Sequence, residues 1–193
     1  MSCVPAFEIG IWNAWIFMIW LLIQNYGLRL ISKDLYQRGG QPRDMKPSKT
    51  YKILGYVSMS LWLLSTLYSV FLPLKLGTIW FYTGLIVFLA GSAINTVATI
   101  SFALTPMNKP VTTGVYQYSR HPIYAALFLI YLSVGIAAAS WIFLLTAIVW
   151  TVLVNLSAPE EERYCLDKYG DSYHKYMERT PRWIGIPLNV KRG

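Results

Sequence analysis

The chain has 193 residues, of which 55% are hydrophobic and 13% are charged, and its formal net charge is +8. This composition is typical of an integral membrane protein with several crossings and excludes an ordinary soluble domain. Two cysteines and two histidines are too few for a disulfide framework or a histidine–cysteine metal cluster, so we expect no metal site.

Apolar segments follow one another along the chain at about 6–28, 51–74, 78–104, 123–139 and 141–156. Each of the first three reaches the length of about 20 residues that a helix needs to cross a bilayer. The last two are shorter and almost contiguous, so they predict a tight helical hairpin around Ala139–Ser140. The predicted fold is an all-α integral membrane protein with five transmembrane helices, and residues 1–193 form a single membrane domain.

The basic residues predict the orientation of these helices. Of the 17 Lys and Arg residues, only Lys75 lies between the second and third segments. With five crossings, every loop that carries the others falls on one side, which the positive-inside rule identifies as cytoplasmic. We expect the N-terminus outside, and the C-terminus and any active site inside. Attraction to anionic lipid accounts for this charge, so we expect the bilayer and no nucleic acid as partner.

After the hairpin the chain becomes polar and predicts a helical cytoplasmic tail. Three acids after Pro159 resemble the first turn of a new helix, and Gly170 can end it in the left-handed conformation. We interpret Glu162 as part of a solvated helix start. Asp171 or Ser172 is expected to cap a second short helix whose tyrosines pack the tail against the membrane surface or the basic loop.

A polar loop leads into the fourth apolar segment through Arg120-His121-Pro122. Proline suits the first position of a helix, where its missing N–H has no partner to lose. The free amides of that first turn attract anions, and Arg120 and His121 add donors beside them. A carboxylate or phosphate could therefore bind here. The alternative is that the pair only anchors the helix at the membrane surface.

The third apolar segment carries small polar residues on one helical face. These residues are Ser92, Asn95, Thr96 and Thr99. Such a face most often packs against another membrane helix, and the alternative is the lining of a substrate passage.

An ordered set of motifs in the C-terminal half carries a family resemblance. The set consists of Thr113-Gly114-Val115-Tyr116, Arg120-His121-Pro122-x-Tyr124, Glu160-Glu161 and Tyr169-Gly170-x-x-Tyr173-x-x-Tyr176. It resembles the isoprenylcysteine carboxyl methyltransferases, above all their small prokaryotic relatives. The phospholipid N-methyltransferases are similar in the same part. The resemblance covers about residues 91–187.

The resemblance implies an S-adenosylmethionine-dependent methyltransferase whose product is S-adenosylhomocysteine. Residues 1–75 would then supply the first two helices, and residues 76–193 would form the cofactor-binding catalytic part. The implied catalytic residues are Arg120 and Glu161. The implied cofactor-binding residues are Lys109, Pro110, Val111, Tyr116, His121, Pro122, Ile123, Tyr124 and Glu161.

The acceptor implied by the resemblance is lipophilic, with a carboxylate as the first expectation. A carboxylate is already anionic, so positioning would carry most of the catalysis, whereas a phospholipid or small amine would need a base such as a Glu. The family's carboxyl methyltransferases have an arginine four positions before the cofactor glutamate. That position is Ser157, which we expect to contact the substrate.

Two other classes of function stay open from the residues alone. A membrane sterol-type reductase has a similar helical architecture and uses NADPH, but a dinucleotide would ask for more basic contacts than Lys109 and Arg120 offer. A non-catalytic membrane protein is favoured only if the loop before Pro122 and the acids near Glu161 do not converge in space.

Overall fold

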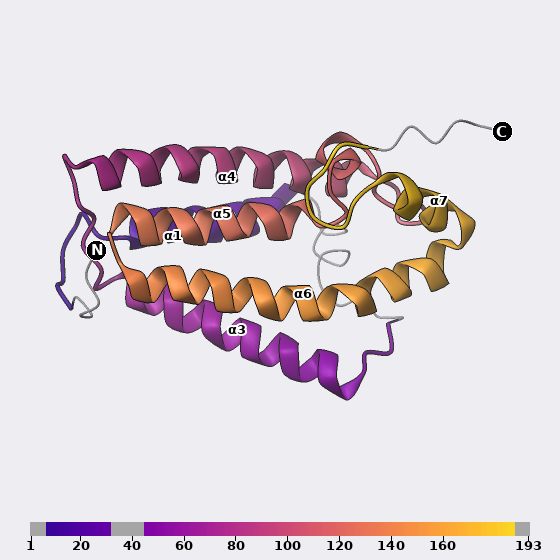
Figure 1. Cartoon of the computed structure of the whole chain (residues 1–193), viewed down its shortest axis with the longest axis horizontal. Helices are drawn as coiled ribbons and strands as arrows, with labels where there is room; N and C mark the ends of the chain where they lie inside the picture. Colours follow the sequence, from indigo (N-terminus) through magenta and orange to yellow (C-terminus); the bar gives the residue numbers. More distant parts are fainter. Residues whose placement is uncertain (1–6, 32–44, 188–193) are drawn as a thin grey trace.

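The computed structural model describes residues 7–31 and 45–187, with side chains described outside 25–31, and within them the secondary structure is helical, apart from one isolated bridge between Asn13 and Pro73. The elements are α1 (Trp15–Ile31), α3 (Lys49–Ser69), α4 (Ile79–Leu104), the 3-10 turn η1 (Gly114–Gln117), α5 (Pro122–Ala137), α6 (Trp141–Tyr169) and α7 (Asp171–Arg179). Helices α4, α5 and α6 lie lengthwise side by side in Figure 1, and η1 and α7 lie together at one end. The all-α prediction is confirmed.

The hairpin between α5 and α6 is confirmed. Its turn passes through Ala139, whose φ of 51° lies in the left-handed region, and Ser140 caps α6 by accepting a hydrogen bond from the Phe143 N–H. Gly135 lets the two arms approach closely, because a Cβ there would stand 2.5 Å from the Leu144 side chain.

The predicted boundary at Pro159 is wrong, because α6 is one helix of 29 residues that continues through it. Pro159 has no N–H to donate to the carbonyl of Asn155, and both residues are exposed. The helix ends at Tyr169, where Gly170 has a φ of 54° as expected. Gly170 also precedes α7 directly, so the cap expected from Asp171 is not formed.

The first helix begins later than predicted. Its expected start at Ala6 lies outside the described residues, and α1 begins at Trp15. Before it, the Asn13 amide donates to the carbonyls of Glu8 and Val70, at 2.7 Å each. These bonds hold the chain in a turn against the C-terminal end of α3, so α1 begins only after that turn.

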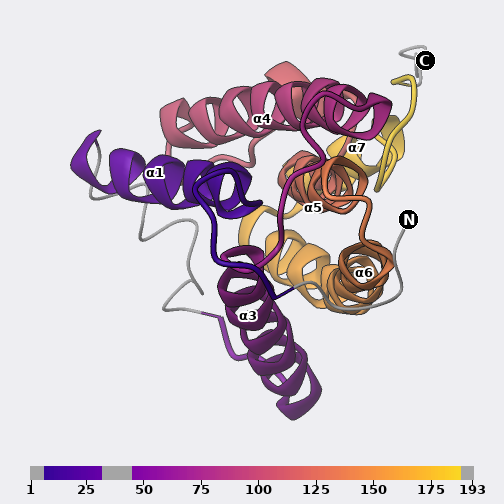
Figure 2. The same cartoon turned by 90° about the vertical axis from the view of Figure 1, so that its left-hand side faces the viewer.

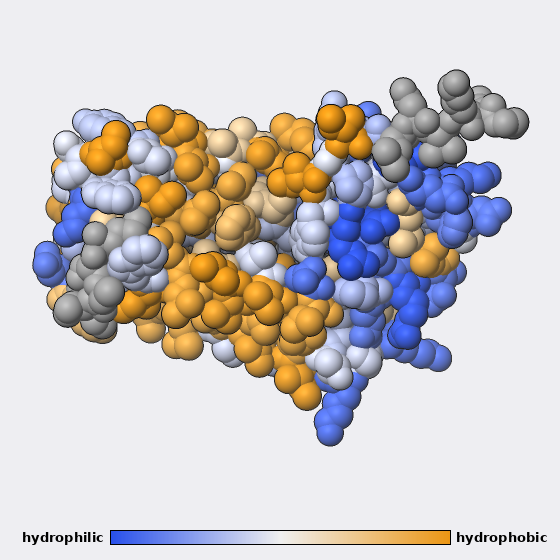
Figure 3. All heavy atoms as spheres, in the orientation of Figure 1, coloured by the Kyte–Doolittle hydropathy of each residue, from blue (hydrophilic) through white to orange (hydrophobic). Residues whose placement is uncertain are grey.

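Within the described residues, α4 and α6 are long and apolar enough to cross a membrane, and α5 and the stretch Trp15–Gln24 are shorter apolar helices. A hydrophobic surface covers the helices and gives way to a hydrophilic one at the end that carries α7 (Figure 3). The apolar part of α6 is residues 141–156, and its charged remainder extends to that hydrophilic end.

The core is centred on α5, which lies between α4 and α6 (Figure 2). Gly84 of α4 permits the close approach, because a Cβ there would stand 2.6 Å from Ala137 of α5. On another side of α4, Asn95 donates to the Gln24 side chain of α1 at 2.7 Å, and Gln24 donates to Thr96 at 3.3 Å. The prediction that this polar face makes helix–helix contacts is confirmed for these two residues.

Candidate functional site

The polar end of the molecule brings together the loop before α5, the last turns of α6 and the segment after α7. We call residues 180–187 the C-terminal strap. Two backbone hydrogen bonds fasten the strap to the loop, from the Arg120 N–H to the Pro181 carbonyl and from the Gly185 N–H to the Tyr118 carbonyl, each at 3.0 Å. The strap is therefore fixed to the loop, and the contacts of Arg120 and His121 with Glu162 bring the loop to the acids of α6.

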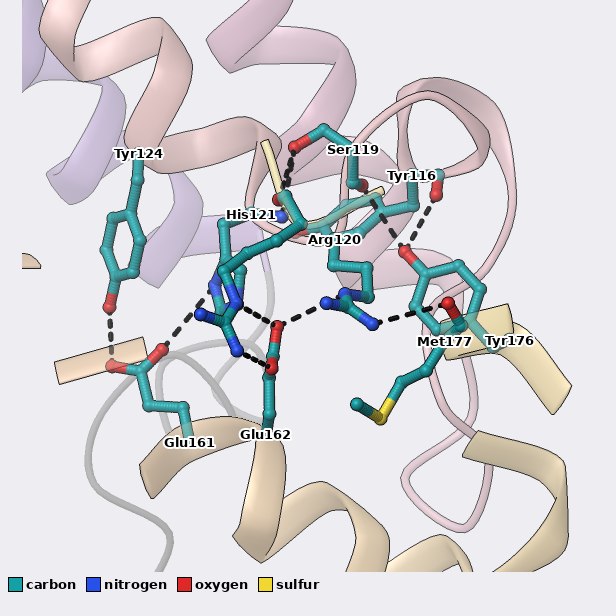
Figure 4. Close-up of polar contacts among 10 residues, drawn as sticks. Tyr116, Ser119, Arg120, His121, Tyr124, Glu161, Glu162, Tyr176 and Met177 are labelled. Atoms are coloured by element: carbon teal, nitrogen blue, oxygen red, sulfur yellow. Dashed lines mark hydrogen bonds and ion pairs between the residues drawn. The ribbon is translucent and has the colours of Figure 1, made fainter. Parts of the chain in front are cut away.

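Glu162 is the centre of a buried ionic cluster. Its side chain is only 3% exposed, and its carboxylate lies 3.1 Å from Arg120 Nε and 3.2 Å from His121 Nε2. Arg182 of the strap donates to both oxygens, from Nε at 3.0 Å and from Nη2 at 2.6 Å. In Figure 4 the carboxylate points between these groups, away from the other acid of the site. The prediction that Glu162 is solvated is wrong, because α6 turns this residue toward the loop and the strap.

These contacts keep Glu162 ionised. Burial alone would raise the pKa of Glu162, but hydrogen bonds with His121 and Arg182 and the nearby guanidinium charges lower the pKa to about 2. One carboxylate thus compensates cations from two distant segments.

Glu161 is held mainly by neutral donors. The hydroxyls of Tyr124 and Tyr51 both donate to its Oε1, at 2.7 Å and 3.0 Å, while Oε2 lies 3.7 Å from His121 Nδ1. Burial raises the pKa of Glu161, and the hydrogen bonds from the phenols and the nearby His121 ring offset only part of this effect. The side chain of Glu161 remains 24% exposed, whereas that of Glu162 is 3% exposed.

Aromatic rings cluster around His121 and Tyr124, two neighbours of Glu161. The rings of His121 and Tyr124 stack with centroids 5.5 Å apart, Trp150 meets Tyr124 edge-on at 6.0 Å, and Trp183 of the strap lies 5.8 Å from His121. Aromatic faces attract cations. The site therefore combines a carboxylate, stacked rings and the N-terminus of α5.

Comparison with known proteins identifies the family. A family model described as phospholipid methyltransferase matches residues 74–172, just over half of the chain. The chain belongs to this methyltransferase family. Over 80 residues it is also 32% identical to the protein-S-isoprenylcysteine O-methyltransferase of Schizosaccharomyces pombe, a stretch that makes up 40% of this chain and 33% of the relative. The chain thus spans about a third of the length of the curated relative that it matches, and the resemblance seen in the sequence is confirmed.

Several other predicted cofactor residues of this methyltransferase-family protein lie near the same end. Pro122 is the first residue of α5, as expected. Val111 and Tyr116 are buried in a second hydrophobic cluster, with Ile123 packed against it. Pro110 is half-buried, and Lys109 is exposed in the loop after α4.

Tyr116 is fixed by the tail. The Tyr176 hydroxyl donates to the Tyr116 carbonyl at 2.7 Å, and the Tyr116 ring lies 6.5 Å from that of Phe102. Arg120 donates to the Met177 carbonyl at 3.4 Å. The expectation that the tail packs against the basic loop is confirmed.

Ser157 lies one helical turn before Glu161 and is buried. Its hydroxyl donates to the Leu153 carbonyl of its own helix at 3.1 Å. The position where relatives carry arginine therefore supplies no charge.

Sequence reasoning missed Ser48, Tyr51 and Arg182. Ser48 donates to Glu160 from its N–H and its hydroxyl, each at 2.6 Å. The sequence did indicate Arg182, because this cation directly follows the Thr-Pro pair that ends the tail helix. It could have been paired with the acids after Pro159. No sequence signal indicated Tyr51, since it lies in a helix outside the resemblance.

Proposed function

We propose that the protein transfers a methyl group from S-adenosylmethionine to a lipophilic acceptor at the membrane surface. The observation that carries the proposal is Glu161, an acid with a partly exposed side chain whose carboxylate is held by two phenols beside the N-terminus of α5. When bound, the cofactor would supply a methyl group on a cationic sulfonium.

The residues present fit the chemical groups of that cofactor. Glu161 offers a negative charge to an ammonium, and the first-turn amides of α5 offer donors to a carboxylate. The rings of His121 and Tyr124 offer faces to a cation. Arg120 stays a predicted catalytic residue, but its ion pair with Glu162 favours a role in holding the loop in place.

The surroundings of Glu161 bear on the acceptor. A carboxylate acceptor, our first expectation, would be helped by a cation, but Arg120 and Arg182 both engage Glu162 and Ser157 replaces the relatives' arginine. A second candidate is therefore an amine acceptor. In that case Glu161 would take the proton that the nitrogen loses, in place of pairing with the ammonium of the cofactor. The raised pKa of this carboxylate favours such a role.

A matched pair of probes distinguishes the two acceptors. Purified protein with radiolabelled S-adenosylmethionine is offered dodecanoate or dodecylamine, which share a chain and differ in the head group. Label on the amine alone supports the second candidate, and label on the carboxylate alone supports the first.

We also propose five membrane crossings, with the N-terminus outside and the site and tail in the cytoplasm. The charge distribution supports this topology. Single cysteines at Lys46 and Lys75, both exposed, test it by labelling from one face of sealed vesicles. Labelling of both from the same face would overturn it.

Calorimetric titration with S-adenosylhomocysteine and with NADPH tests the function itself. We expect the first to bind and the second not to bind. Binding of NADPH alone would favour a reductase, and binding of neither would favour a non-catalytic membrane protein.

A further inference from the structure

Helix α3 is attached to the rest of the protein in two different ways. Its buried residues, Ser65 and Ser69, lie near its C-terminal end, and residues 49–64 are exposed or only half-buried. Figure 1 shows α3 slanting away from α6 toward its N-terminal end. Packing therefore anchors one end of α3, and another kind of contact must hold the other.

Polar bonds to two consecutive acids of α6 hold that N-terminal end. The Tyr51 hydroxyl donates to Glu161 Oε1 at 3.0 Å, and Ser48 donates twice to Glu160. Ser48 also caps α3 by accepting from the Tyr51 N–H at 3.1 Å, which orients the turn that carries Tyr51. The first turn of α3 thus meets the proposed site directly.

We propose that Tyr51 is a positioning residue for Glu161, and that it couples the placement of α3 to the affinity of the site for the cofactor. The proposal rests on the proposed function. Tyr51 lies outside residues 74–172, the part that matches the family, so this contact is a feature of the chain's own N-terminal region.

Tyr51 and Tyr124 differ although they donate to the same oxygen. Tyr124 belongs to the core helix α5 and is packed between the rings of His121 and Trp150. Tyr51 comes from the N-terminal end of α3, which the bonds of Ser48 and Tyr51 to the acids of α6 hold near the site. Movement of α3 would therefore remove one donor from Glu161 and leave the other in place.

Loss of that donor changes the protonation of Glu161. The charged and titratable groups that face this carboxylate are Tyr51 of α3, Tyr124 of α5, His121 before α5, and Glu162 and Cys165 of α6. An O–H donor stabilises the ionised form, so its removal favours the protonated form. A protonated Glu161 would hold an ammonium less tightly.

Infrared titration of Tyr51→Phe tests the coupling without any ligand. The protonated-carboxyl band of Glu161, assigned by its loss in Glu161→Gln, is followed against pH in detergent. We expect the midpoint of this band to move to higher pH in Tyr51→Phe. Tyr56→Phe is the matched control, because Tyr56 lies on the same helix, is 73% exposed, and should leave the midpoint unchanged. An unchanged midpoint in Tyr51→Phe would overturn the proposal.

Titration with S-adenosylhomocysteine then tests the consequence. In Tyr51→Phe we expect affinity to fall by on the order of five- to tenfold at a pH between the infrared midpoints of the wild type and the variant, and to stay within about twofold of the wild type at a pH well above both midpoints. An equal loss at both pH values would indicate a merely structural role and overturn the proposal. If the wild type does not bind S-adenosylhomocysteine, the proposed function is wrong. The infrared titration uses no ligand, so it still tests whether Tyr51 controls the protonation of Glu161.

Discussion

Glu161 and Glu162 are adjacent in the sequence, yet their surroundings are opposite. Consecutive residues of a helix point about 100° apart, so one carboxylate faces the loop and strap while the other faces α3 and α5. Cations lower the pKa of Glu162 to about 2, whereas burial raises the pKa of Glu161. We therefore expect two different roles. Glu162, which is neutralised within the protein, should stabilise the fold, and Glu161 should bind the ligand of the proposed function.

The largest effect is expected from Glu162→Gln. Removing the carboxylate of a buried ionic cluster leaves Arg120 and Arg182 without their charged partner and should destabilise the protein by about 3–5 kcal/mol. Denaturant unfolding in detergent measures the change. Glu178→Gln is the control, since Glu178 is 54% exposed and pairs with His174 within one helix.

The same cluster predicts how acid affects stability. A depressed pKa in the folded state means that the contribution of Glu162 is present above its unfolded pKa and is lost as pH falls toward about 2. Glu162→Gln should therefore unfold with a weaker dependence on pH in that range. Equal acid dependence in the wild type and the variant would show that the cluster does not stabilise the fold.

Glu161→Gln should affect binding more than folding. Loss of a charged partner is expected to weaken binding of S-adenosylhomocysteine by about 1.5–3 kcal/mol, with stability within about 1 kcal/mol of the wild type. Calorimetry and unfolding on the same preparation measure both. Asp167→Asn, an exposed acid on the same helix, should change neither. A large stability loss at Glu161 would remove the distinction between the two carboxylates.

Local signals in the sequence were enough to predict much of the fold. The hairpin at Ala139–Ser140, the start of α5 at Pro122 and the end of α6 before Gly170 each depend on residues within one or two turns. The predicted start of α1 was wrong, because the Asn13 side chain donates a hydrogen bond to Val70 at the end of α3, 57 residues away. This bond fixes the chain in a turn before the helix begins.

Local sequence signals could not distinguish the environment of Glu161 from that of Glu162. Which face of α6 is buried depends on Arg182, 20 residues later, and on His121, 41 residues earlier. The family resemblance pointed to Glu161 but said nothing about Glu162. Tyr51 lies 110 residues from Glu161, in a helix without a recognisable motif, so no pattern indicated their contact.

Arg182→Met should destabilise the protein less than Glu162→Gln, because the carboxylate keeps its ion pair with Arg120 and its hydrogen bond with His121. We expect about 1–3 kcal/mol, the range for a hydrogen bond to a charged group that is partly exposed. The strap should also loosen, which a change in Trp183 fluorescence would report. Arg179→Met, at an exposed position of α7, is the control. Unchanged fluorescence and stability would mean that the backbone bonds alone hold the strap.

Glu160 is the third acid of the run and extends the comparison to a carboxylate at the surface. Its hydrogen bonds with Ser48 lower its pKa despite the opposing effect of burial, and they hold the start of α3. Ser48→Ala removes both the helix cap and one of these bonds, so it should destabilise the protein by about 1 kcal/mol, the smallest effect of the series. Thr50→Ala, at an exposed position in the same turn, should change stability less. Because Ser48 orients the turn that carries Tyr51, the loss should be accompanied by weaker binding of S-adenosylhomocysteine at low pH. A stability loss without that change would mean that Tyr51 keeps its bond to Glu161 even when the cap of α3 is gone.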